Sequence, residues 1–257
     1  MTAWRNEVSY AVGTLTRVPV PPPALLDRAV AGRGLAMAPI VGAAVGLLSG
    51  LPLLFSQADT LGRLMSATVV VALAAWLTRA LHWDGLADLA DGLGSRRPAP
   101  EALDVMRRSD IGPFGVLVVL TTASLQVLGL ARVPSGTTSL GVWVLTLATA
   151  RLALAAGASQ WVHPARPDGL GALVIGAVTR TRLALAAVLA VVVGGVQAAS
   201  GYVPWSVALL WAPVASLVVA AVVAVVAARR LGGSTGDVLG ATTEIATATV
   251  LVLLTWH

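Results

Sequence analysis

Several residue types are missing or scarce in this 257-residue chain, and each absence excludes a class of function. Cysteine is absent, which excludes disulfides, thiolate metal sites and cysteine nucleophiles. Charged residues make up only 11% of the chain, whereas a soluble domain carries about 25%. Because 57% of the residues are hydrophobic, too few polar side chains remain to cover a soluble core. The composition therefore predicts an integral membrane protein.

Lysine is also absent, so all 17 basic residues are arginine, and the formal net charge is +5. In a membrane protein, excess arginine mainly reports the orientation of the spans. We therefore expect the lipid bilayer as a partner and no nucleic acid. The oligomeric state stays open, a homo-oligomer included.

Hydrophobic segments long enough to cross a membrane recur along the chain, since a spanning helix needs about 20 mostly apolar residues. They predict an all-α polytopic bundle of about seven transmembrane helices, in a single domain over residues 1–257. The predicted spans are 36–55, 64–82, 113–131, 139–157, 183–200, 203–228 and 241–256.

The arginines are distributed unevenly between the two sides of these spans. They are frequent in residues 1–35 and in the connections 83–112, 158–182 and 229–240, whereas the alternate connections hold only Arg63 and Arg132. Positive loops stay in the cytoplasm. We therefore expect a protein of the cell inner membrane with a cytoplasmic N-terminus, an external C-terminus and an active site on cytoplasmic loops.

The first 35 residues form a separate amphipathic segment. Trp4, Val8, Val12 and Leu15 repeat at the spacing of one helix face, and the proline-rich run 15–23 ends that helix. Two interpretations stay open. The helix lies flat at the cytoplasmic interface, or it packs on the bundle.

The strongest chemical signal is the segment HWDGLADLADGLG, residues 82–94. In a helix, Asp84, Asp88 and Asp91 project from one face and repel one another, with no basic residue between them. Hard oxygen ligands suit Mg²⁺ or Mn²⁺, so these three carboxylates are candidate metal ligands. His82 precedes them as a candidate catalytic residue, the alternative being a hydrogen-bonding residue at a helix end.

Two further segments offer phosphate contacts. Arg107, Arg108 and Ser109 carry donors suited to phosphate, although positive-inside charge alone also explains the two arginines. The glycine-rich segment 231–244 predicts a turn before a helix, whose backbone N–H groups can face an anion. Its candidate residues are Gly233, Thr235 and Gly236 for binding and Asp237 for catalysis, with Glu244 two turns further on.

Two other polar features are less specific. The connection 158–182 contains RPDGLGALV with Arg166 and Asp168, which is compatible with a re-entrant loop or with a loop that covers a substrate. Arg151 lies inside a predicted span, where it either snorkels to the cytoplasmic interface or faces the bundle interior as a functional charge.

Taken together, the segments resemble the cobalamin synthase family, the adenosylcobinamide-GDP ribazoletransferases. The resemblance lies in LTRVPVP, LHWDGLADLADGLG, EALDVMRRSDIGPFG, RPDGLG and LGGSTGDVLGATTE, which follow in the family's order over residues 15–244. It implies transfer of α-ribazole, or of its 5′-phosphate, to adenosylcobinamide-GDP with release of GMP. Asp84, Asp88 and Asp91 would then hold Mg²⁺, and Asp91, Asp237 or His82 would accept a proton. The corrinoid is implied by the resemblance alone.

Two other classes fit parts of the sequence. A CDP-alcohol phosphatidyltransferase needs D-x2-D-G-x2-A-R and then G-x3-D-x3-D; residues 88–92 begin this pattern, but Ser95 and Arg96 stand at its A-R and the second part does not follow. A prenyltransferase shares the aspartate-rich character. A transporter would explain Arg151 and the glycine-broken spans, but transporters usually place polar groups near the membrane midplane.

Overall fold

The computed structural model describes residues 3–199, 201–204 and 207–256, and these residues form helices without a strand. In chain order, the helices are α1 (Ala3–Leu15), α2 (Arg28–Ala36), α3 (Ala38–Gly50), the 3₁₀ turn η1 (Leu51–Phe55), α4 (Thr60–Leu77), α5 (Leu81–Gly94), α6 (Ala99–Val105), α7 (Pro113–Ala131), α8 (Thr137–Gly157), α9 (Gly169–Val174), α10 (Arg180–Ala198), the π-turn η2 (Val207–Trp211), α11 (Ala212–Leu231) and α12 (Gly236–Thr255).

The described residues contain seven helices that are long and apolar enough to cross a membrane. They are α3 with η1, α4, α7, α8, α10, η2 with α11, and α12, and they confirm the seven predicted spans within a few residues. Residue 200 and residues 205–206, on which two of the predicted ranges fall, lie outside the described residues.

Helices α8 and α12 form the centre of the bundle, because 78% of the residues in each hydrophobic window are buried. In α4, α7, α10 and α11 the buried share is only 22–28%, so their apolar side chains face outward. A helix that is apolar on its outer face needs lipid around it. The pattern is therefore that of a membrane bundle with two central helices.

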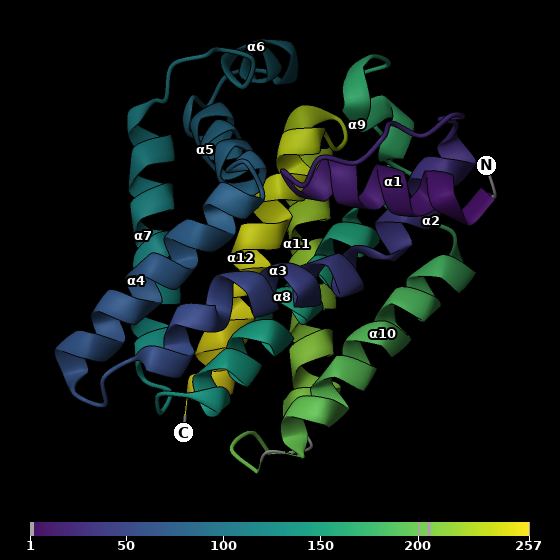
Figure 1. The fold of residues 1–257 in the computed structure, drawn as a ribbon. Coiled ribbons are helices and arrows are strands. Elements are labelled where there is room, and N and C mark those ends of the chain that lie inside the picture. Colours follow the sequence, from purple (N-terminus) through teal and green to yellow (C-terminus); the bar gives the residue numbers. More distant parts are fainter. Residues whose placement is uncertain (1–2, 200, 205–206, 257) are drawn as a thin grey trace.

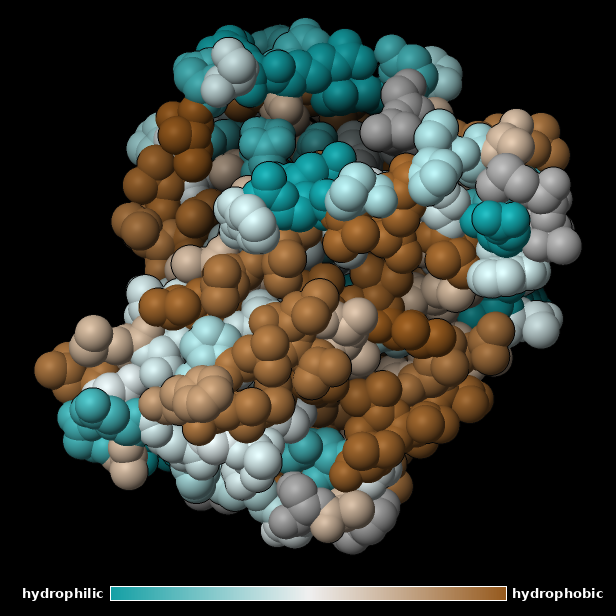
Figure 2. Space-filling model, viewed as in Figure 1, coloured by the Kyte–Doolittle hydropathy of each residue, from teal (hydrophilic) through white to brown (hydrophobic). Residues whose placement is uncertain are grey.

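The two ends of the bundle differ in character. The N-terminus, α1, α5, α6 and α9 lie at one end, and the C-terminus lies at the other (Figure 1). Polar residues gather at the end that carries α5 and α6, and hydrophobic residues dominate the surface below it (Figure 2). The segments that the arginine distribution assigned to one side thus lie together.

The second predicted span ends earlier than expected. Helix α4 stops at Leu77, and His82 belongs to the next helix, α5. Arg79 and Ala80 adopt positive φ angles of 56° and 53°, a left-handed conformation that ends the α4 helix. The break turns the chain, so that α5 carries the aspartates away from the direction of α4 (Figure 1).

Helix α1 lies across this end of the bundle and packs on it, which is one of the two interpretations of the amphipathic segment (Figure 1). Tyr10, Ala11 and Leu15 are buried against the bundle, whereas Trp4 is 62% exposed. Arg79 donates hydrogen bonds of 3.0 Å to the carbonyls of Gly13 and Thr14 at the end of α1. Arginine thereby satisfies carbonyls that the helix end leaves free, and α1 is held against the α4–α5 junction.

Candidate active site

Two glycines let α5 and α12 approach each other closely. A Cβ atom at Gly85 would lie 2.7 Å from the Asp237 carbonyl oxygen, and one at Gly240 would lie 3.1 Å from the His82 Cα. Any side chain at these positions would push the helices apart. Gly85 of α5 and Gly240 of α12 therefore allow the aspartates of α5 to lie next to the start of α12.

Asp84 and Asp88 of α5 and Asp237 of α12 lie near this contact, where their negative charges interact. Partial burial raises the pKa of Asp88 to about 7, and the negative charges of Asp84, Asp237 and Asp91 add to the rise. Such mutual repulsion marks a place where a cation is favourable. The helix predicted for the aspartate segment is confirmed as α5, and Asp237 adds a carboxylate from another element.

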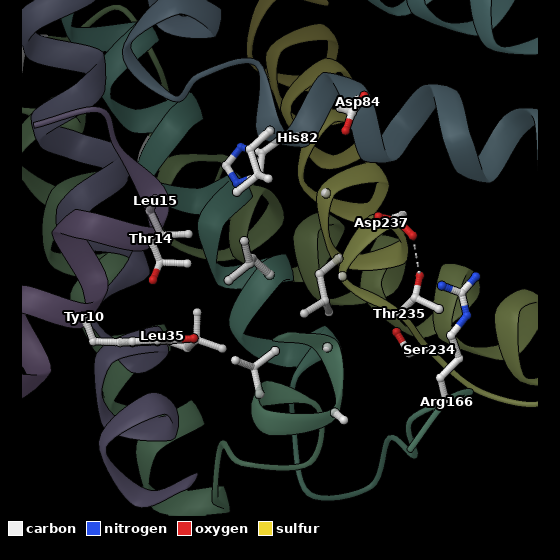
Figure 3. A pocket seen from close by; sticks show the side chains of 18 of the residues that line it. Tyr10, Thr14, Leu15, Leu35, His82, Asp84, Arg166, Ser234, Thr235 and Asp237 are labelled. Atoms are coloured by element: carbon white, nitrogen blue, oxygen red, sulfur yellow. Dashed lines mark hydrogen bonds between the residues drawn. The ribbon is translucent and has the colours of Figure 1, made fainter. Parts of the chain in front are cut away.

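A cavity of about 290 Å³ opens beside these carboxylates (Figure 3). It lies between α1, α2, α5, the end of α8, the segment around α9 and the start of α12. Its lining residues are Tyr10, Thr14, Leu15, Leu35, Leu81, His82, Asp84, Leu154, Arg166, Asp168, Gly171, Ala172, Val174, Ser234, Thr235, Gly236, Asp237, Leu239 and Gly240. Five of the candidate residues from the sequence line it: His82, Asp84, Thr235, Gly236 and Asp237.

The start of α12 forms one wall of the cavity. Thr235 caps the helix by accepting a 3.3 Å hydrogen bond from the Val238 N–H, and its hydroxyl donates to the Asp237 carboxylate at 3.2 Å. A Cβ atom at Gly236 would meet nothing within 4 Å, so the helix N-terminus is open to a ligand. The 20-residue helix directs its positive dipole end there, which favours a phosphate.

The preceding turn is fixed by the 158–179 connection. The Ser234 N–H donates to the His163 carbonyl and the Ala165 N–H donates to the Ser234 carbonyl, each at 2.8 Å. Gly233 is buried behind this pairing, since a Cβ atom there would lie 2.7 Å from both the Ala165 nitrogen and the His163 oxygen. Gly233 therefore supports the turn and does not line the cavity. The pairing places Arg166 on the same side as Asp237 (Figure 3).

His82 is 2% exposed, and both of its ring nitrogens lack a hydrogen-bond partner among the described residues. Burial and the positive charge of Arg151 lower its pKa to about 3, so the imidazole is neutral at physiological pH. Its Nδ1 lies 3.7 Å from the Glu244 carboxylate, which accepts a 2.8 Å hydrogen bond from Gln126. A neutral ring with open nitrogens binds polar ligand groups but is a weak proton acceptor.

Arg151 faces the bundle interior and is only 4% exposed. Of the two alternatives for Arg151, the structure supports the one in which its charge faces the bundle interior. Glu244, on α12, interacts electrostatically with it. The predicted carboxylate of Glu244 lies in this interior group and does not line the cavity.

The second candidate phosphate segment lies at the rim. Arg107 pairs with Asp168 at 3.5 Å, both side chains being largely exposed. Arg108 and Ser109 are exposed and do not line the cavity. The structure thus brings only Arg107 of this segment near the site.

Asp91 has partners of its own. Its two carboxylate oxygens accept hydrogen bonds from the Gly112 N–H at 2.7 Å and the Gly115 N–H at 2.9 Å. These amides belong to the start of α7, so Asp91 satisfies a helix N-terminus and joins α5 to α7. Among the described residues, no group of three or more acidic or histidine side chains could hold a metal ion by itself.

The sequence alone did not reveal the contribution of α1 and α2. Tyr10, Leu15 and Leu35 line the cavity from elements that precede the aspartates by about 50 residues or more. Tyr10 and Leu15 lie on the buried face of α1, but no local pattern indicates which part of the bundle that face contacts. Arg166 lines the cavity and interacts electrostatically with Asp237, and the pairing of its loop with the turn at Ser234 became visible only in the fold.

The structure is that of a polytopic membrane bundle, and the cavity at one end of it combines carboxylates, an arginine and a helix N-terminus, which are groups suited to binding phosphates. The cobalamin-5-phosphate synthase family matches residues 7–255. The chain therefore belongs to this family of transferases of cobalamin biosynthesis.

Curated relatives agree over nearly the full length. An adenosylcobinamide-GDP ribazoletransferase of Frankia casuarinae is 39% identical over 96% of this chain and 94% of its own length. Proteins of the same name from Nocardioides sp. and Sinorhizobium medicae are 38% and 34% identical, over 97% and 96% of this chain and 96% and 94% of their own lengths. No solved structure matches the chain significantly.

Proposed function

We propose that this protein joins α-ribazole, or its 5′-phosphate, to adenosylcobinamide-GDP and releases GMP. The observation that carries the proposal is the family match over residues 7–255, supported by relatives named for this reaction. Of the classes that the sequence left open, the family membership selects this transferase. The cavity supports it, because its polar groups suit a pyrophosphate and an attacking alcohol.

The reaction exchanges the phosphoanhydride bond of a pyrophosphate for a phosphate ester bond. A ribose hydroxyl of the acceptor attacks the phosphorus that is attached to the cobinamide, and a new O–P bond forms. The bond between that phosphorus and the bridging oxygen breaks, GMP leaves with the electron pair, and the hydroxyl proton passes to a base. Such a transfer requires in-line positioning and neutralisation of charge.

Asp84 and Asp88 are the residues that would hold Mg²⁺, with Asp237 facing them from α12. Their mutual repulsion, seen in the raised pKa of Asp88, fits a bound cation. Since no group of three or more acidic or histidine side chains among the described residues could hold a metal ion by itself, waters and substrate phosphates would have to complete the coordination of Mg²⁺, which usually takes one or two carboxylates. When bound, the ion would neutralise charge on the pyrophosphate. Asp91, the third predicted ligand, would need to release an amide of α7 to join them.

The phosphates are proposed to bind at the start of α12. The open N-terminus at Gly236 supplies backbone N–H groups, and Arg166 supplies a planar donor set from the facing loop. Arg166 also donates a short hydrogen bond to the Leu103 carbonyl, which fixes its position relative to α6. Arg107, paired with Asp168 at the rim, is placed to meet the outer phosphate or the departing GMP.

Asp237 is the proposed proton acceptor. It lines the cavity, lies beside the open N-terminus, and is oriented by the hydroxyl of Thr235. His82 also lines the cavity, but its low pKa makes it a hydrogen-bonding residue in this proposal. A base must lie within hydrogen-bond reach of the hydroxyl that it deprotonates, and both side chains border the same space (Figure 3).

We also propose that the protein lies in the cell inner membrane with its N-terminus and the cavity on the cytoplasmic side. The support is the grouping of the arginine-rich segments at the end that carries α1, α5 and α9 (Figure 1). Both substrates would then reach the cavity from the cytoplasm.

The test is an assay with the purified protein in detergent. Adenosylcobinamide-GDP, α-ribazole phosphate and Mg²⁺ are supplied, and GMP and the joined corrinoid are measured by chromatography. Equal amounts of both products, dependent on both substrates, are expected. Failure to form either product in a folded preparation, in detergent and in liposomes, would overturn the proposal.

A further inference from the structure

The cavity has two halves of different chemistry. Asp237, Thr235, Ser234 and Arg166 lie on one side, and Tyr10, Thr14, Leu15 and Leu35 lie on the other (Figure 3). We call these the polar half and the apolar half. The polar half contains the groups proposed above for the phosphates, whereas that assignment leaves the apolar half without an occupant.

The apolar half is built by elements distant in sequence. Tyr10 and Leu15 of α1, Leu35 of α2, Leu154 of α8 and Leu239 of α12 contribute side chains to it. All five are at most 5% exposed, so a ligand among them is removed from water. Hydrophobic walls with a few polar groups are typical of sites for small organic ligands.

The size of the cavity restricts its occupant. Its volume of about 290 Å³ lies at the lower end of the range for small-molecule pockets, roughly 300–1,000 Å³. A nucleoside is of this scale, but a corrin macrocycle with its side chains is several times larger. The corrinoid part of the donor must therefore remain outside, with only its phosphates reaching the polar half.

His82 lies between the two halves. In Figure 3 its ring extends toward the side of Thr14 and Leu15, whereas Asp84 lies toward Asp237. Both ring nitrogens are buried and unpartnered within the described chain. Nδ1 faces the Glu244 carboxylate at 3.7 Å. Buried polar atoms normally have hydrogen-bond partners, so the unpartnered Nε2 of this cavity-lining residue can serve a hydroxyl group of a ligand.

We infer that the apolar half binds the flat aromatic base of the acceptor nucleoside, with its ribose beside His82 and a ribose hydroxyl directed toward Asp237. This inference rests on the proposed function. The guanine of the donor is a poorer occupant, because it carries more donors and acceptors than the hydroxyls of Tyr10 and Thr14 can satisfy there. A benzimidazole base has few polar atoms, so removing it from water into the apolar half costs little free energy.

Direct binding tests the inference without catalysis. The intrinsic fluorescence of the benzimidazole in α-ribazole is titrated with purified protein, in the absence of donor. Leu35→Phe fills the apolar half and is expected to weaken α-ribazole binding about tenfold or more, the scale of discrimination by pocket size. Leu48→Phe is the matched control, because Leu48 is 53% exposed on the outer face of α3. It should leave the binding constant unchanged.

A second variant covers the case in which Leu35→Phe does not fold. Leu15→Ala enlarges the apolar half, and it should weaken α-ribazole binding while relatively improving binding of a nucleoside with a bulkier fused base. In steady-state assays, both variants should raise the KM for α-ribazole and leave the KM for adenosylcobinamide-GDP unchanged.

Two outcomes would overturn the inference. They are unchanged α-ribazole binding by both variants, and an increase in KM that is confined to adenosylcobinamide-GDP. Absence of GMP release by wild-type protein that still binds α-ribazole would instead contradict the proposed function.

Discussion

Asp88 should make the stability of the protein depend on pH. Its pKa is raised from 3.8 to about 7, so between these values the folded protein binds more protons than the unfolded chain. The free energy of unfolding of the metal-free protein should therefore fall as the pH rises through this window. Asp88→Asn removes the titrating group, so it should flatten this dependence. Thermal unfolding in detergent across the window measures both.

The same carboxylates should make Mg²⁺ binding depend on pH, since a carboxylate ligand must be ionised. Mg²⁺ should raise the Tm of the wild-type protein more at about pH 8 than at about pH 6, on either side of the raised pKa of Asp88. An equal Mg²⁺ effect at both values would contradict a role for Asp88 in holding the ion.

Asp237 should be the residue whose charge matters most for proton transfer. Asp237→Asn keeps the shape and the hydrogen bond from Thr235 but removes the acceptor, and we expect kcat to fall about tenfold to a hundredfold or more. Asp110→Asn is the control, because Asp110 is exposed and does not line the cavity. GMP release by the two variants is the measurement. Equal rates would remove Asp237 from the chemistry.

Single residues also show how far the sequence could predict the site. His82, Asp84 and Asp237 were identified as candidates because ionisable side chains next to a membrane span are costly and usually have a function. The partners of Asp91 were not, since its contacts with the Gly112 and Gly115 amides depend on how α7 returns to α5. Repeated aspartates on one helix face therefore indicate charge, but they do not separate a ligand from a helix cap.

At the scale of elements, the distance between α5 and α12 determines the site. Gly85→Ala would place a Cβ atom 2.7 Å from the backbone of Asp237, and the helices must separate. We expect a loss of about 1–3 kcal/mol of stability, typical of overpacking, together with reduced GMP release. Thermal shift and activity measurements on the same preparation test both expectations.

Gly195→Ala is the matched control for that change. A Cβ atom at Gly195, within α10, would make only ordinary contact at 3.7 Å with Leu209. Because alanine favours a helix over glycine by about 1 kcal/mol, this variant should be neutral or slightly more stable. A loss of stability for Gly85→Ala beside a gain or no change for Gly195→Ala would support close packing of α5 on α12. Equal stability changes for the two substitutions would contradict it.

The junction of α5 and α7 depends on Asp91. Asp91→Asn replaces an acceptor of two amides by a group with one acceptor atom, and we expect a loss of about 1–3 kcal/mol, typical of an unsatisfied buried donor. Added Mg²⁺ should not restore the stability. If Asp91→Asn left the Tm unchanged and only weakened Mg²⁺ activation, Asp91 would be a metal ligand, as the sequence predicted.

The elements also show which parts of the fold were predictable. The hydrophobic lengths predicted all seven spans, because a membrane helix must satisfy its backbone within one segment. The end of α4 was placed too late, since the left-handed Arg79 and Ala80 carry no glycine or proline as a signal. The packing of α1 on the bundle was left open because amphipathicity does not distinguish protein from lipid as the apolar partner.

For the whole molecule, the arrangement of the two ends predicts the topology. The chain has no native cysteine, so single cysteines can be labelled without background. A cysteine at Ser95, after α5, should react with an impermeant maleimide only after cell permeabilisation. A cysteine at the exposed Gln57, in the turn before α4, should react in cells whose cytoplasmic membrane is intact, once the maleimide has access to the outer face of that membrane. The reverse pattern would invert the orientation and place the cavity outside.

The most direct test of the account is the Mg²⁺ dependence of GMP release by purified Asp84→Asn protein beside wild type. Asp84 lies in the cavity and, with Asp88 and Asp237, defines the proposed ion position. The account predicts a rate reduced at least about tenfold at low Mg²⁺, partial recovery at high Mg²⁺, and an unchanged or higher Tm without metal. A near-wild-type rate with unchanged Mg²⁺ dependence would contradict the proposed metal site.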